Sequence, residues 1–158
     1  MADKMNIYIG ATAMRTCLGN KAETLTAMHE GRCGLRYNDV FGMYAGVCDA
    51  EILDSYTRFE SMLIEQINDV LKQSGISLSD DDVQLIISTT KGNVDLLAED
   101  CDNIPRRAFI GESAKIISQY FGCKNVPVVV SNACISVVSA FVVARDMMIS
   151  GRCRHFNV

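Results

Sequence analysis

The stretch from 126 to 151, VPVVVSNACISVVSAFVVARDMMISG, constrains the fold of this chain more than any other. Residues 126–130 are β-branched apart from Pro127, which predicts a buried strand. Small and polar residues interrupt the apolar run at 131–133, and apolar residues then continue from Cys134 to Ile149 for about four helical turns. The stretch therefore predicts a strand followed at once by a mostly buried helix, with Cys134 in the first helical turn.

This placement makes Cys134 a candidate nucleophile. Unpaired backbone N–H groups and the helix dipole favour a thiolate at the start of a helix, and the thiolate is the reactive form of cysteine. The alternative interpretation is that Cys134 is a small core residue, which is the more usual role of a cysteine in an apolar segment. A membrane-spanning interpretation of 126–144 fails, because Pro127 and polar residues interrupt the run and Arg145 follows directly.

Composition limits the possible function classes. A length of 158 residues favours one domain with a sizeable core. The net charge of −4 argues against nucleic-acid binding, which usually needs a basic face. The seven cysteines are dispersed and form no CxxC pair, which favours reduced thiols over a disulfide framework or a structural zinc site. The first residues contain no secretion signal, so we expect a cytoplasmic protein without membrane insertion.

The remaining sequence predicts alternating strands and helices. Strands are expected at 6–14, 83–88, 126–130 and from 155 to 158, with short strands around 40–47. Helices are expected at 22–30, from 57 to 74 and at 110–121, the first two opened by the capping boxes Asn20/Glu23 and Thr57/Glu60. The segment 94–109 is expected to be loop and short helix. Alternation of this kind predicts an α/β fold with a mostly parallel sheet and helices on both faces.

In such sheets ligands bind beyond the carboxyl ends of the strands. The turn at 131–134 follows a strand and therefore lies at such an end. The loop TTKGN at 89–93 follows another strand, but it lacks the GK[ST] pattern of a phosphate-binding loop. The position of the turn strengthens the interpretation of Cys134 as a nucleophile.

Three segments resemble the β-ketoacyl-acyl-carrier-protein synthases, which are condensing enzymes of the thiolase fold. SNACIS around Cys134, preceded by NVPVVV, is similar to the nucleophile segment of that family. IYIGATAMRTCLGN followed by LTAMHEGRCGLR is similar to its first strand and helix, and VQLIISTTKG to the strand and loop before its central crossover. The resemblance covers nearly all of 1–158 and implies the N-terminal half of a thiolase-like fold, with the C-terminal half absent.

The resemblance also implies a mechanism. Cys134 is expected to carry the acyl group and to donate its backbone N–H to the oxyanion, in a decarboxylative condensation with malonyl-acyl-carrier protein. The basic catalytic pair of the family comes from the second half, so this chain alone is expected to be inactive. His29 and His155 lie outside the family's histidine motifs. Val137 stands where related sequences often have glycine. No metal or redox cofactor is expected.

Acyl carrier protein is the partner that the resemblance implies. Arg106 and Arg107 lie in a region similar to one that contributes to carrier docking in the family, although a solvated charge pair is an equal alternative. In the family, the strand before the nucleophile pairs across a two-fold axis. A homodimer or heterodimer through 126–130 is therefore expected.

Two other interpretations remain open. One is a non-catalytic structural or dimerisation partner of a condensing enzyme, although relatives of that kind replace the cysteine. The other is a self-contained small α/β binding domain, for which the sequence offers no cofactor fingerprint. Neither acyl-chain length nor the pathway can be inferred from these residues.

Overall fold

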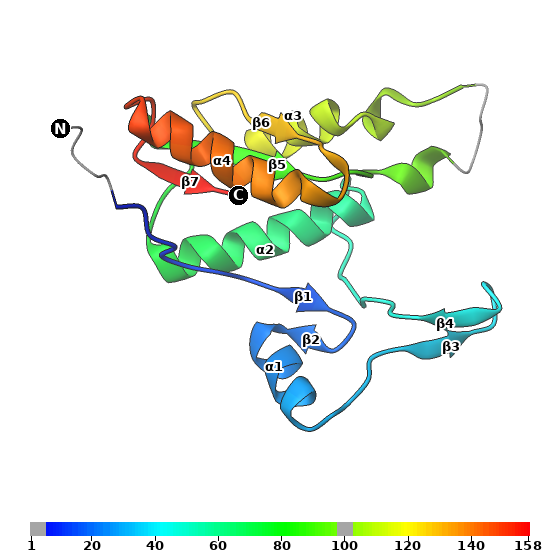
Figure 1. Ribbon diagram of the computed structural model, residues 1–158. Coiled ribbons are helices and arrows are strands. Elements are labelled where there is room, and N and C mark those ends of the chain that lie inside the picture. Colours follow the sequence, from blue (N-terminus) through cyan, green and yellow to red (C-terminus); the bar gives the residue numbers. More distant parts are fainter. Residues whose placement is uncertain (1–5, 98–102) are drawn as a thin grey trace. The chain divides into compact units, whose positions relative to one another are not determined.

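The computed structural model describes residues 6–97 and 103–158, which form two compact units (Figure 1). The first, here called the sheet unit, comprises 74–158 together with the segment that ends at Gly10. The second, here called the helical unit, comprises residues 11–73. Cys134, Arg106 and Arg107 all belong to the sheet unit.

The sheet unit is built on three parallel strands. They are β5 (Val83–Ser88), β6 (Val128–Val130) and β7 (His155–Asn157), in the order β6-β5-β7. Ile86 pairs with Val128 and Leu85 with Asn157, so β5 is the central strand of this sheet. The expected α/β class with a parallel sheet is confirmed.

Two helices connect these strands and cover opposite faces of the sheet. α3 (Ile110–Tyr120) lies between β5 and β6 in sequence, and α4 (Ser136–Ile149) lies between β6 and β7. The first crossover runs from β5 to β6, and the second runs in the opposite direction from β6 across β5 to β7. Crossovers of one hand that run in opposite directions place their helices on opposite faces. In Figure 1, α4 lies in front of the strands and α3 behind them.

The core between α4 and the sheet is built around small side chains on the helix. Ala140 and Ala144, one helical turn apart, pack against Ile86 at the centre of β5, and Val128, Val130, Val143 and Phe156 surround them. Alternation along β5 turns Val83, Leu85 and Ile87 to the other face, where each is at most 4% exposed. Alanines at the contact let the helix approach the strands closely.

The connections around α3 contain short 3₁₀ turns. η1 (Val94–Leu97) and η2 (Arg106–Ala108) precede the helix. They agree with the loop and short helix predicted for 94–109, of which residues 98–102 lie outside the described part. Asn93 is fully buried and joins these pieces, because its Nδ2 donates to the carbonyl of Arg107 and to Ser113 Oγ, each at 2.8 Å. This amide fixes η2 next to the loop that follows β5.

The helical unit contains both predicted capping boxes. In α1 (Lys21–His29), Asn20 Oδ1 accepts from the backbone N–H groups of Ala22 and Glu23, and Glu23 returns a bond to the Asn20 N–H. In α2 (Arg58–Ser74), Thr57 and Glu60 exchange the same pair of bonds. Local hydrogen bonds of this kind explain why both helix starts were predictable.

The unit also has two small antiparallel pairs. β1 (Arg15–Thr16) pairs with β2 (Gly19–Asn20), and β3 (Arg36–Asn38) pairs with β4 (Met43–Ala45). The second pair replaces the short strands expected around 40–47. Its first strand begins earlier than expected.

The strand predicted at 6–14 is wrong. Residues 6–14 form no strand, and Tyr8 and Ile9 are 80% and 71% exposed. An apolar β-branched segment becomes a strand only where a neighbouring strand satisfies its backbone, and no such neighbour pairs with this segment within the described residues. Two other predicted elements are shorter than expected, since β6 begins at Val128 and α4 at Ser136. No helix in the described ranges is long and apolar enough to cross a bilayer.

Candidate functional site

The sheet unit has a topological switch point between β5 and β6. The chain leaves the carboxyl end of β5 towards α3 on one face, and it leaves the carboxyl end of β6 towards α4 on the other. Open α/β sheets bind ligands at such a point, beyond the carboxyl ends of two strands whose connections diverge. Residues 89–93 and 131–134 follow these two strand ends, and Cys134 is among them.

The turn that carries Cys134 has an unusual backbone. Ala133 has φ +46°, a left-handed conformation that residues with a Cβ rarely adopt. Cys134 follows in a 3₁₀ turn, η3 (Ala133–Ile135), in which the Ile135 N–H donates to the Asn132 carbonyl at 3.1 Å. Strained backbone of this kind is found preferentially at functional sites.

Cys134 lies just before α4 rather than inside its first turn. The expected helix start at Cys134 is therefore two residues early, because η3 occupies 133–135. The side chain is exposed, as a nucleophile requires and a core residue does not. Within the described part of the chain, the Cys134 N–H donates to no acceptor. It is thus one of the unpaired amides at a helix start.

The loop after β5 lies beside this turn. The Thr89 N–H donates to the Val130 carbonyl at 3.3 Å, and Thr89 Oγ1 accepts from the N–H groups of Lys91 and Gly92. Gly92 has φ +56° and lies against Ile110, where a Cβ would come within 3.1 Å of that side chain. Ser88 ends β5 with a buried hydroxyl that has no hydrogen-bond partner among the described residues. The loop is compact and polar.

Arg106 and Arg107 lie at the same end of the sheet. Both are in η2, whose backbone Asn93 ties to the loop after β5. The Arg106 side chain is 85% exposed and forms an ion pair with Glu112 at 3.3 Å, while Arg107 is half-buried. The structure thus brings the two predicted site segments, 106–107 and 131–134, to one edge.

The charge of Arg106 is partly offset by Glu112. A hydrogen bond from Lys115 and the charges of Lys115 and Arg106 hold the pKa of the Glu112 carboxyl below its usual value. Glu112 therefore stays ionised at neutral pH. The ion pairs are favourable above the ordinary pKa of a glutamate and are lost as the pH falls through the lowered value.

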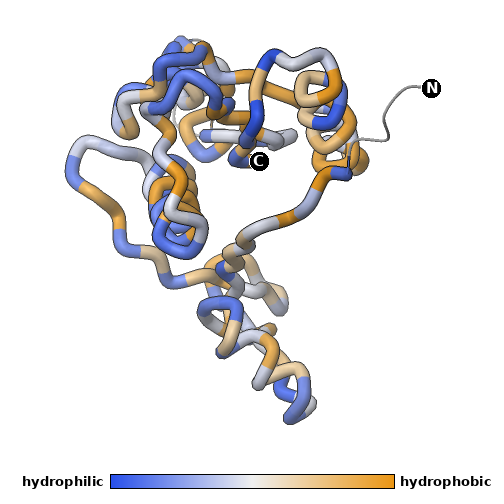
Figure 2. Tube along the Cα trace, turned by 90° about the vertical axis from the view of Figure 1, so that its left-hand side faces the viewer, coloured by the Kyte–Doolittle hydropathy of each residue, from blue (hydrophilic) through white to orange (hydrophobic). Residues whose placement is uncertain are grey.

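The outer face of α4 is apolar and uncovered. Val137, Val138, Phe141 and Val142 are each between 48% and 63% exposed, and hydrophobic residues follow one another along this helix (Figure 2). A contiguous apolar face of this kind usually marks an interaction surface. Val137 is 56% exposed and is not among the residues that pack on Ile86.

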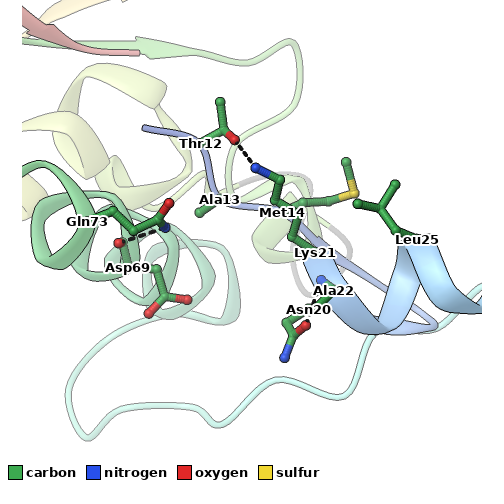
Figure 3. Close-up of a pocket in the computed structure, with 9 residues that line it drawn as sticks. All are labelled: Thr12, Ala13, Met14, Asn20, Lys21, Ala22, Leu25, Asp69 and Gln73. Carbon is green, nitrogen blue, oxygen red and sulfur yellow. Dashed lines mark hydrogen bonds between the residues drawn. The ribbon is translucent and has the colours of Figure 1, made fainter. Parts of the chain in front are cut away.

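A hollow of about 360 Å³ lies in the helical unit and contains none of the predicted site residues (Figure 3). Lys21 Nζ donates to Thr12 Oγ1 at 2.5 Å, and Gln73 Nε2 donates to the Asp69 carbonyl at 3.0 Å. Each of these two hydrogen bonds joins residues that line the open hollow. Nothing about them indicates a reaction.

The structure brings neither histidine to the candidate site. His29 ends α1 in the helical unit, and His155 begins β7 at the opposite end of the strands. In the described ranges, no three His, Cys, Asp or Glu side chains are grouped so that they could hold a metal ion.

Sequence reasoning missed three features of this site. They are the left-handed Ala133, the buried hydroxyl of Ser88, and Ser136, which binds the backbone on both sides of Ala133. Serines and alanines in a small-residue turn carry no distinctive sequence signal. A backbone angle, a buried hydroxyl without a partner and two local hydrogen bonds single them out, and these are visible only in the structure.

We predict that iodoacetamide alkylates the exposed Cys134 and Cys33 before Cys123 and Cys153. Burial raises the pKa of the Cys123 thiol, and burial together with the Asp82 charge raises the pKa of Cys153, so both hold less thiolate at neutral pH. Peptide mass spectrometry over time should show them reacting about tenfold more slowly, with a gap that narrows as the pH rises. Equal rates for Cys134 and Cys153 in the folded chain would contradict this.

No protein-family model matches the sequence, and no curated protein matches it. Among solved structures, the ketosynthase from module 1 of the bacillaene synthase of Bacillus amyloliquefaciens is similar, with a TM-score of 0.62 and 16% identity. The similarity covers 92% of this chain and 31% of the ketosynthase chain.

Two further structures overlap less well. They are 3-oxoacyl-(acyl carrier protein) synthase III, FabH, from Xanthomonas oryzae pv. oryzae (TM-score 0.45, 17% identity, 82% of this chain and 33% of that chain) and cerulenin-bound OleA from Xanthomonas campestris (TM-score 0.43, 16% identity, 90% and 38%). The chain therefore has the thiolase-like fold of the condensing enzymes and spans about a third of the length of the ketosynthase that it matches.

Proposed function

We propose that this chain is the nucleophile-bearing, N-terminal half of a cytoplasmic β-ketoacyl-acyl-carrier-protein synthase. The observation that carries the proposal is the exposed Cys134 in a strained turn at the switch point of a thiolase-like sheet. An exposed thiol at a helix start is suited to covalent catalysis, and the carboxyl ends of β5 and β6 are where an open α/β sheet would receive an acyl thioester.

The first half-reaction is thioester exchange. The Cys134 thiolate attacks the carbonyl carbon of an acyl group carried on the phosphopantetheine of acyl carrier protein. A tetrahedral oxyanion forms, the bond from carbon to the carrier sulfur breaks, and the carrier leaves as a thiolate that takes up a proton. The acyl group is then bonded to Cys134 Sγ.

The backbone supports this step through its unpaired amide. The Cys134 N–H, which binds no acceptor in the described chain, serves as one donor to the oxyanion. The second donor comes from the second half of the enzyme. Loss of one such donor costs about 2.7–4 kcal/mol in the barrier.

The second half-reaction needs residues that this chain does not contain. Malonyl-carrier protein loses carbon dioxide at the basic pair of the second half, and the resulting carbanion attacks the acyl carbonyl on Cys134. The new carbon–carbon bond forms as the Cys134 thiolate leaves. Every bond made or broken on this chain therefore involves a single sulfur atom.

The uncovered face of α4 supports a second half as the covering partner. Val137, Val138, Phe141 and Val142 are exposed immediately after the turn that carries Cys134, so a body that packs on them also lies next to Cys134. Covering apolar side chains contributes roughly 25 cal/mol per Å². The similar ketosynthase is about three times longer than the aligned part, which leaves ample chain for such a body.

The 158-residue chain is predicted to form no condensation product from acyl- and malonyl-carrier protein, because it lacks the basic pair. When the second half is supplied, elongation should appear and should fall to background in Cys134→Ala, with Cys33→Ala as the matched control for an exposed thiol. Product is measured by mass spectrometry of the carrier-bound acyl chain. Elongation by the chain alone, or by Cys134→Ala in the completed enzyme, refutes the proposal.

Arg106 and Arg107 form the proposed docking site for the acidic carrier protein. η2 lies at the carboxyl end of β5, the end at which the phosphopantetheine must enter to reach Cys134. An acidic partner is attracted to a local basic surface even on a protein of net charge −4. Glu112 weakens this attraction by pairing with Arg106.

Charge reversal should therefore slow the reaction of Cys134 with the carrier protein and leave its reaction with a small reagent unchanged. For R106E/R107E we expect crosslinking of Cys134 by a carrier protein loaded with chloroacryl-pantetheine to slow about tenfold, while alkylation by free chloroacrylamide is unchanged. Glu112→Gln should accelerate the carrier reaction by freeing Arg106. R152E/R154E reverses two exposed charges before β7, at the other end of the sheet, and is the control. Equal slowing of both reagents would exclude a docking role.

We further propose that two chains pair along β6. This strand is at one edge of the described sheet, and Val126 beside it is 83% exposed, with its carbonyl held by Gln84 Nε2 at 2.8 Å. An unprotected edge of this kind is a site for strand pairing. The segment 126–130 is then the dimer interface.

Sedimentation velocity should show a dimer that Val126→Lys weakens about tenfold, because each chain then brings a charged side chain to the paired edge. Val40→Lys places the same charge on a side chain that is 87% exposed in the helical unit and should leave the dimer intact. A monomeric parent chain, or equal effects of the two variants, would rule out pairing through β6.

A further inference from the structure

We propose that Ser136 is a positioning residue that locks the turn presenting Cys134. This inference rests on the proposed function for the importance of Cys134, but its geometry stands on the hydrogen bonds of the turn alone. Ser136 is the first residue of α4 and is 5% exposed. It does not touch the reacting atoms and acts through the backbone on either side of Ala133.

The Ser136 hydroxyl uses both of its hydrogen-bonding functions on this turn. Its Oγ accepts from the Asn132 N–H at 2.8 Å and donates to the Ala133 carbonyl at 2.7 Å. One oxygen therefore binds the peptide group before the Asn132 Cα and the peptide group after the Ala133 Cα. Both distances are in the range of good hydrogen bonds, and the site is sheltered from water.

These two bonds hold a conformation that alanine does not favour. Ala133 at φ +46° is less stable in isolation than in the right-handed region, since its Cβ crowds the following carbonyl oxygen. Such a conformation persists only when the surrounding structure over-determines it. The Ser136 hydroxyl is well placed to do so, because a change in φ at Ala133 moves the Asn132 N–H and the Ala133 carbonyl relative to one another.

The hydroxyl is itself fixed by the core. Ser136 lies one helical turn before Ala140 on the buried face of α4, and Ala140 packs against Ile86 in β5. Its position is therefore set by the sheet. The segment between β6 and Cys134 is therefore fixed relative to β5 and β6, the strands at the switch point.

The consequence for Cys134 is a defined place for its sulfur. With the turn locked, the exposed Cys134 is held in one conformation immediately before α4, at the unpaired backbone N–H groups of the helix start. Without the lock, Ala133 relaxes to the right-handed region and the sulfur leaves that place. The rate at which Cys134 reacts then falls, although the side chain stays exposed.

The test compares Ser136→Ala with Ser139→Ala in the 158-residue chain. Ser139 also binds Asn132, but through the side-chain Nδ2 at 3.1 Å, so it is a matched control. Alkylation by iodoacetamide is followed at Cys134 and at the exposed Cys33, which serves as the internal reference. We expect the ratio of the two rates to fall about 5- to 30-fold in Ser136→Ala, the range that the cost of a left-handed alanine gives, and to stay unchanged in Ser139→Ala.

A second variant separates positioning from general stability. Glycine visits the left-handed region about as readily as the right-handed one, so in an Ala133→Gly background the loss caused by Ser136→Ala should shrink to about twofold. Thermal unfolding midpoints of both serine variants should agree. An unchanged rate ratio in Ser136→Ala, an equally large loss in the glycine background, or unfolding of Ser136→Ala at the assay temperature overturns the proposal.

The outcome is independent of the acyl-transfer assay. If the completed enzyme fails to condense but Ser136→Ala lowers the rate ratio, the proposed function is wrong and the positioning role stands. If condensation depends on Cys134 but the ratio does not change, the reverse holds.

Discussion

The packing of α4 on the central strand through Ala140 and Ala144 is the contact on which the rest of the site depends. Small side chains bring the helix close to Ile86 and fix where it begins, at the carboxyl end of the sheet. The short connection from β6 to α4 must then reverse direction within a few residues, which it does with a left-handed Ala133 and a 3₁₀ turn. An exposed thiol at that point follows from the close packing of the helix behind it.

Prediction from sequence succeeded where structure is local or repetitive. The runs at 83–88 and 155–157 became strands because each found a parallel neighbour, and the capping boxes at Asn20 and Thr57 set helix starts through bonds within one turn. The segment 6–14 has the same β-branched character but no partner, and it is not a strand. β propensity describes a surface that fits a neighbour, so it cannot say whether the neighbour exists.

The chemistry was predictable only in part. Cys134 was found because a cysteine between a strand and a helix is a recognisable pattern, and its exposure agrees with that interpretation. The hydrogen bonds of the Ser136 hydroxyl and the ion pair of Arg106 with Glu112 form only when folding brings their partners together, so the sequence does not reveal them. The apolar outer face of α4 shows the same limit, since the run 137–142 reads as core although one side of it is exposed. The sequence pattern there is that of a helix covered on all sides.

The site depends above all on the conformation of the turn at 132–136. A crystal structure of the chain alkylated by chloroacetamide tests this conformation most directly. The account predicts an adduct on Cys134, Ala133 in the left-handed region, the Ser136 hydroxyl between Asn132 and Ala133, and the Cys134 adduct's carbonyl oxygen within hydrogen-bonding distance of the Cys134 N–H. An unmodified Cys134, or a right-handed Ala133 with Cys134 inside a continuous helix, would contradict it.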